Sequence, residues 1–248
     1  MSLESKLITV AENQEKVYNA GKDAYYDFFW DNFQENGNRV NYICAFGGQW
    51  TTETFKPKYP IKPTRAYMMF FNNQGLGMIV DDFVEFCREN NIILDFSNCV
   101  DAQYGLACLW GNHFGVLDFS KCTGTSSLSN LFYSHNYANG VKKIDELIIT
   151  EATAFHTSTF QQATQLAEIT KITGAIGTSI SLGVCPLNKA SIVNVINALS
   201  ATTTGKTVTF KKTSINTAFG INVDNESTYT TEWNTLRGSK GNWSFSFA

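Results

Sequence analysis

A histidine, an aspartate and a serine lie close together in the chain, at His113, Asp118 and Ser120. Hydrolases use these side chains for nucleophilic catalysis, in which the histidine takes the serine proton and the aspartate orients the histidine. The sequence around Ser120 lacks the G-x-S-x-G elbow that exposes such a nucleophile, and serine is common throughout the chain. We therefore interpret the three residues as a chance combination, and the sequence predicts no catalytic residues and no enzyme.

Two of the three histidines, His135 and His156, are 21 positions apart. If neighbouring structural repeats placed them side by side, they could share a metal ion. No carboxylate or cysteine accompanies both at a matching position, and the six cysteines include no C-x-x-C pair. We therefore expect ordinary surface histidines, no metal site and no cofactor.

Two aspartate–serine pairs form the candidate ligand-binding site: Asp95 with Ser97, and Asp118 with Ser120, 23 positions further on. On adjacent strands, about 4.8 Å apart, the two carboxylates would repel each other, and at least one pKa would rise. This predicts a small acidic patch that a protein or glycan ligand could bind. The alternative is a pair of solvated aspartates that accept hydrogen bonds from the adjacent serines.

These four residues belong to a phrase that occurs twice, as ILDFSNC at 93–99 and VLDFSKC at 116–122. Internal repeats of roughly 20 to 30 residues are typical of solenoids, in which one unit stacks on copies of itself. In each copy two alternating apolar residues precede a cysteine, which is the L-x-L-x-x-(N/C) core of a leucine-rich repeat. Because strand side chains alternate between faces, we expect burial of Leu94, Phe96, Leu117, Phe119, Leu147 and Ile149.

Weaker copies of the phrase follow, and the last of them starts at Ile169 with Lys171 in its second inward position. In this alignment a small residue closes the turn in each copy of the phrase. These residues are Cys99, Cys122, Ala152 and Gly174. Because alanine and glycine replace cysteine in the later copies, the position is one of packing. We expect Cys99 and Cys122 to be buried, unreactive thiols.

The segment FQQATQLAEI at 160–169 resembles the F-x-x-C-x-x-L-x-x-I phrase of the BspA-like (Treponema pallidum type) leucine-rich repeats, with Ala163 in place of the usual cysteine. Ala154-Phe155 and Ala218-Phe219 match a second phrase of that family. The resemblance covers residues 42–220 and implies a surface protein that binds other proteins or matrix without catalysis. Residues 18–36 and 233–248 resemble the flanks of repeat proteins encoded by gut bacteria and their prophages.

The fold class expected from the repeats is α/β: an open leucine-rich-repeat solenoid with an N-terminal helical region and a C-terminal strand cap. Residues 1–41 form the helical cap or assembly segment in this interpretation, residues 42–220 the solenoid, and residues 221–248 the C-terminal cap. Apolar spacing predicts helices over 77–90 and 188–201, the second capped by Asn188. Strict alternation over 242–247 predicts a strand that covers the edge of the last repeat.

Apolar residues spaced by four and three predict a helix over 2–19, with Leu3, Leu7, Val10 and Val17 on one face. This helix either packs on the end of the solenoid or forms a short coiled coil that makes a homo-oligomer. The coiled coil would suit the alternative function, a structural subunit of a phage tail or fibre.

Composition narrows the classes of partner. Charged residues make up 17% of the chain and the formal net charge is −3, so the protein lacks the basic surface that nucleic acid requires. No run approaches the roughly 18 apolar residues of a membrane span. No signal peptide is visible, because no apolar segment follows Met1. With the resemblance, we expect an extracellular, cell-surface or virion location.

Overall fold

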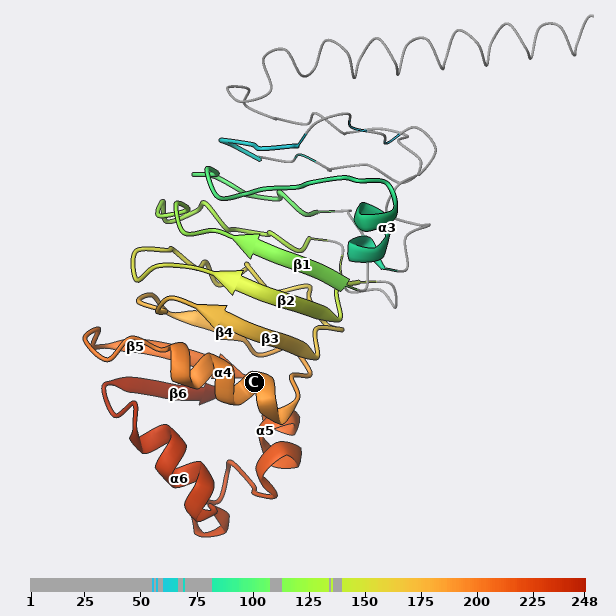
Figure 1. The fold of residues 1–248 in the computed structure, drawn as a ribbon. Coiled ribbons are helices and arrows are strands. Elements are labelled where there is room, and N and C mark those ends of the chain that lie inside the picture. The colour runs from blue at the N-terminus through green and yellow to red at the C-terminus, as the bar shows by residue number, and fades with distance from the viewer. Residues whose placement is uncertain are drawn as a thin grey trace, which may run out of the picture.

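A computed structural model describes residues 55, 57, 60–66, 69, 82–107, 113–133, 135 and 140–248. In chain order its elements are α3 (Phe83–Glu89), β1 (His113–Asp118), β2 (Lys143–Ile148), β3 (Glu168–Thr173), β4 (Ile180–Leu182), α4 (Lys189–Ala198), β5 (Lys206–Phe210), α5 (Lys212–Phe219), η1 (Glu226–Thr228), α6 (Thr231–Gly238) and β6 (Trp243–Phe247). The strands form two parallel three-stranded sheets, β1-β2-β3 and β4-β5-β6. Figure 1 shows them stacked in chain order in a mixed α/β fold, with α3 near one end and α6 at the other.

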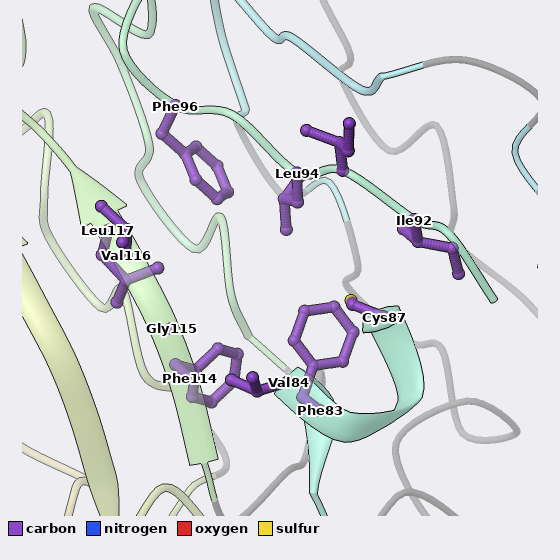
Figure 2. Close-up of a pocket in the computed structure, with 11 residues that line it drawn as sticks. Phe83, Val84, Cys87, Ile92, Leu94, Phe96, Phe114, Gly115, Val116 and Leu117 are labelled. Atoms are coloured by element: carbon purple, nitrogen blue, oxygen red, sulfur yellow. The ribbon is translucent and has the colours of Figure 1, made fainter. Parts of the chain in front are cut away.

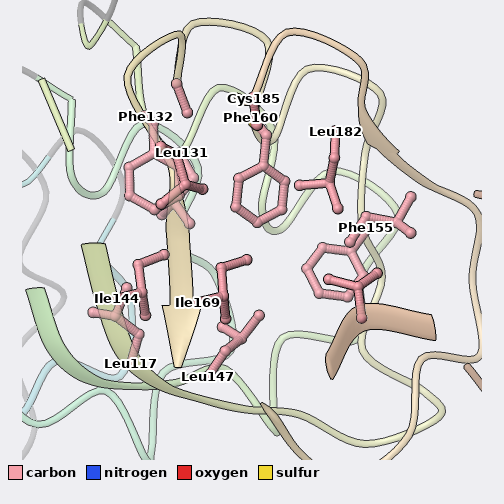
Figure 3. Packing of buried hydrophobic residues seen from close by; sticks show 14 of the residues in the cluster. Leu117, Leu131, Phe132, Ile144, Leu147, Phe155, Phe160, Ile169, Leu182 and Cys185 are labelled. Atoms are coloured by element: carbon pink, nitrogen blue, oxygen red, sulfur yellow. The ribbon is translucent and has the colours of Figure 1, made fainter. Parts of the chain in front are cut away.

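Backbone pairing brings the apolar residues of successive strands into rows. Phe114 of β1 pairs with Ile144 of β2, and Leu117 pairs with Leu147, and all four side chains are buried. Figure 3 shows Leu117, Ile144 and Leu147 facing buried aromatic side chains from the connecting segments, among them Phe132. Each such side chain contributes about 1.5–3 kcal/mol by leaving water. Burial is confirmed for five of the predicted inward residues, Phe96, Leu117, Phe119, Leu147 and Ile149.

Leu94, the sixth predicted inward residue, is only half-buried. Its turn pairs with the preceding one through a bridge to Ile61. Leu94 lines a cavity on its other side, so it lacks the apolar neighbour that a paired strand would supply.

The observed register corrects the predicted alignment of the last copy. Ile172, not Ile169, pairs with Leu147, whereas Ile169 pairs with Ile144. Lys171 is therefore exposed on the outer face rather than in an inward position. The two isoleucines have the same three-residue spacing as Ile144 and Leu147, so the hydrogen-bond ladder alone decides between them.

The small residue predicted to close each turn is observed in the first two copies of the repeat, and the later copies differ from the prediction. Cys99 and Cys122 are buried free thiols, as predicted, and the Cys122 thiol donates to the Cys99 carbonyl at 3.1 Å. Ala152 is exposed, and Thr153 is buried beside it. Gly174 directly follows β3 and is exposed, and its φ of +99° and a backbone carbonyl oxygen 1.9 Å from the place of a Cβ exclude a side chain.

Helix α4 closes the first sheet. The side chain of Ser191 accepts a hydrogen bond from the Ile169 backbone N–H at 2.8 Å, and the Asn194 amide donates to the Ile169 and Thr170 carbonyls at 3.1 and 2.7 Å. These contacts satisfy backbone groups that a further strand would otherwise pair. The helix predicted over 188–201 is confirmed, and Asn188 caps it by accepting from the Ser191 N–H at 2.9 Å.

Some of the other predicted elements lie within the described residues and some lie outside them. Helix α3 lies inside the predicted 77–90 segment, and β6 lies inside 242–247 and covers the edge of β5 by parallel pairing. Residues 221–248 also contain α6, which was not predicted and whose Trp233 ring lies 4.9 Å from that of Phe219. The helix predicted over 2–19 and the rest of the N-terminal segment lie outside the described residues.

His135 is a core residue, which makes the predicted surface position wrong. Its side chain is fully buried, its Nε2 lies 2.9 Å from the Leu106 carbonyl oxygen, and its Nδ1 accepts from the Val141 N–H at 3.1 Å. Only the neutral ring with a proton on Nε2 satisfies both contacts. Burial lowers the pKa of His135 to about 4. His156 is exposed, so the two histidines do not form a pair.

Replacing Leu117 by alanine should reduce the free energy of unfolding by about 2–5 kcal/mol, because it leaves a cavity in the buried row. The neighbouring Val116 is 54% exposed, so Val116→Ala should change stability by less than about 0.5 kcal/mol. Urea unfolding followed by circular dichroism measures both. Equal effects of the two substitutions would contradict the assigned register.

The buried His135 should make stability fall in weak acid. Because its pKa is lower in the folded state than in the unfolded chain, the full stability is present above about pH 6.5 and is lost as the pH falls toward 4. The loss should approach about 3 kcal/mol. In His135→Gln this part of the pH dependence should disappear, although the variant is less stable at pH 7. Parallel pH profiles for both proteins would argue against a buried neutral histidine.

Candidate binding site

The predicted site residues hold two local turns, one after the bridge residue Leu94 and the other at the end of β1. Asp95 Oδ1 accepts from the Ser97 backbone N–H at 2.9 Å, and Asp118 Oδ1 accepts from the Ser120 N–H at 3.0 Å. In addition, Lys62 Nζ lies 3.3 Å from Asp95 Oδ2. An aspartate that binds the backbone N–H two residues later stabilises a local turn, so these carboxylates have partners within the chain.

Asp95 is not electrostatically strained. Burial alone raises its pKa, but hydrogen bonds from Ser97 and the nearby charge of Lys62 outweigh this, and the pKa of Asp95 lies below its usual value. The rise predicted from repulsion by Asp118 is therefore wrong for Asp95, because each aspartate is held by its own turn and Asp95 also has a lysine.

The structure separates the residues that could resemble a hydrolase triad. His113 opens β1, whereas Asp118 closes the same strand and Ser120 follows it. Five residues of strand span about 16 Å, far beyond hydrogen-bonding distance. The structure therefore agrees with the sequence analysis that these three residues do not act together.

An apolar groove lies between the turn at 92–96 and β1, with α3 as its third wall (Figure 2). Its volume is about 250 Å³. The groove is lined by Phe83, Val84, Cys87, Ile92, Ile93, Leu94, Phe96, Phe114, Gly115, Val116 and Leu117. None of these described lining residues is charged.

The groove exists because segment 92–96 and β1 meet at one end and separate at the other. At the closed end the rings of Phe96 and Phe119 are 5.5 Å apart, and Lys121 Nζ donates to Asn98 Oδ1 at 2.7 Å. Within the described residues, neither strand pairing nor a backbone hydrogen bond joins 92–95 to β1. The facing edge of β1 is thus open toward the groove.

Helix α3 holds the wide end of the groove. The Phe83 ring packs 5.5 Å from the Phe114 ring, and Val84 lies over Gly115, where an added Cβ would be 3.5 Å from Val84 Cγ2. Burial, with a smaller effect of the Asp82 charge, raises the pKa of the Cys87 thiol to about 12. The Cys87 thiol is therefore protonated at neutral pH and is no nucleophile.

A polar rim borders the groove at the start of β1. Asp82, the N-cap of α3, places Oδ2 3.1 Å from His113 Nδ1, and Asp145 of β2 places Oδ1 2.8 Å from His113 Nε2. Lys143 Nζ lies 3.5 Å from Asp145 and 3.4 Å from Glu168. Burial alone lowers the pKa of His113, but the Asp145 and Asp82 carboxylates outweigh it and raise the pKa above its usual value.

Two exposed apolar residues lie at the groove, and their repetition in the sequence could have indicated them. Ile93 and Val116 are 55% and 54% exposed and occupy the same position in the two copies of the repeated phrase. The next strands have Glu146 and Lys171 at this position. An apolar residue in an outward position of both copies could have marked this surface, which the sequence analysis missed.

Comparison with known proteins gives no match to a family model, a curated protein or a solved structure. In the part of the chain that the structure describes, no helix combines the length and apolar character needed to cross a bilayer. The same residues contain no group of three histidine, cysteine or carboxylate side chains placed to hold a metal ion.

His113 should stabilise the protein more in acid than in base, because its pKa is raised in the folded state. The contribution is fully present below the unfolded value of about 6.5 and is lost as the pH rises through the folded value. The difference in unfolding free energy between wild type and His113→Gln should therefore be larger at about pH 5.5 than at about pH 8.5. A difference that does not change with pH would show that the two carboxylates do not stabilise the imidazolium.

Proposed function

We propose that residues 42–220 form a leucine-rich-repeat solenoid of the BspA-like type, with residues 1–41 and 221–248 as its caps. Support comes from the repeated phrase at 93–99 and 116–122 and from parallel strands that follow one another in chain order. The role we propose is non-enzymatic binding of a polypeptide partner at a cell or virion surface. The surface location rests on the sequence resemblance.

The observation that carries the proposed binding function is the open apolar groove beside β1. Apolar surface bordered by polar residues often marks a binding site, and here Ile93 and Val116 adjoin a cavity whose described lining residues are uncharged. A strand edge next to such a groove offers backbone hydrogen bonds to an extended chain. These features favour a polypeptide over a glycan, whose hydroxyl groups require polar partners.

The alternative function, a structural subunit of a phage tail or fibre, depends on an N-terminal assembly helix. That segment lies outside the described residues, so this alternative rests on the sequence pattern alone.

A random peptide library displayed on phage tests the binding function. Peptides selected on the wild-type protein should lose at least about tenfold in affinity for Val116→Asp, because a charge in the groove wall opposes apolar contact. Val100→Asp is the matched control, since Val100 is 48% exposed and does not line the groove. Selection of peptides that bind both variants equally, or of no peptides, would refute the groove as a binding site.

A further inference from the structure

The rim and the groove together define a more specific ligand, an inference that rests on the proposed binding function. We propose that the groove binds an extended peptide segment that inserts one bulky apolar side chain between 92–96 and β1 and places a lysine or arginine against the carboxylates around His113. Three features of the structure support this: the groove's size, the open strand edge and the charge of the rim.

The size of the groove sets the apolar part of the ligand. Its volume of about 250 Å³ falls below the roughly 300–1,000 Å³ of pockets that enclose whole small molecules. It suits one large side chain, and interfaces commonly concentrate their binding energy in a few such buried anchors. Ile93 and Val116 would surround the anchor with further apolar contact.

The open edge of β1 sets the backbone conformation of the ligand. The described backbone hydrogen bonds of β1 pair it with β2, and none reaches 92–95. An extended segment could pair with this edge near Val116, as strands do when they add to a sheet. Because the closed end at Phe96 and Phe119 blocks a full-length strand, only a short stretch of the segment can pair.

The charge of the rim sets the polar part of the ligand. His113 faces Asp82 on α3 and Asp145 on β2, and Lys143 and Glu168 continue the row. When His113 is neutral, three carboxylates face one lysine, so the rim is acidic and complements a cation. When His113 is protonated, it neutralises part of that charge and competes with the ligand cation.

The test uses the peptides selected from the phage library. They should share a bulky apolar residue and a lysine or arginine within the same short segment, and glutamine in place of the basic residue should weaken binding about threefold to fivefold, as expected for a partly exposed ion pair. Asp145→Asn should weaken the basic peptide by a similar factor and leave the glutamine peptide unaffected. Asp224→Asn, which removes a remote exposed carboxylate paired with Lys212, is the matched control.

The pH dependence gives a second readout by fluorescence anisotropy. Affinity of the basic peptide should increase as the pH rises through the raised pKa of His113, and this increase should be absent in His113→Gln. If the selected peptides depend on Val116 but are insensitive to Asp145→Asn and to the glutamine replacement, the binding function stands and the requirement for a basic residue is wrong. If no selected peptide depends on Val116, both proposals fail.

Discussion

The parallel backbone ladder between successive turns is the constraint on which the rest of this structure depends. It aligns Phe114 with Ile144 and Leu117 with Leu147, so that one row of apolar side chains after another enters the same core. A shift by a single residue would turn buried side chains toward solvent. The same ladder places His113 beside Lys143 and Val116 beside Glu146 on the outer face. The same strand register therefore determines which side chains form the core and which form the proposed binding surface.

Much of the buried row could be predicted because the repeated phrase is nearly identical in its two good copies. Phe96 and Phe119 follow directly from that repetition, and their rings pack against each other at a tilt of 53°. The prediction failed further along, where Ile169 and Ile172 offer two alignments with the same spacing and only backbone pairing selects one. It also failed at Gly174, which is exposed and whose positive φ leaves no apolar pattern in the sequence.

The binding site was less predictable than the core for a physical reason. Asp95 and Asp118 stand out in the sequence because they repeat, yet each binds the backbone two residues away and holds a turn. The rim around His113 combines residues from α3, β1 and β2, and 31 positions separate His113 from Asp82. The groove itself depends on the separation of segment 92–96 from β1 at one end. No residue pattern in the sequence indicates that separation.

The contact between α4 and β3 has a consequence for how the molecule can come apart. Helix α4 touches β3 on one side and α5 and α6 on the other, and it is joined to β3 through Ser191 and Asn194 rather than through a strand ladder. In proteins built from stacked units, stability is a sum of local terms, and cooperative blocks separate where coupling between neighbours is weakest. The α4 junction joins the two sheets without a strand ladder that runs from one to the other, so the sheets can separate there with both ladders intact. Loss of α4 would expose the edge of β3, and an exposed strand edge can pair with another chain. Helix α4 therefore protects the protein against aggregation.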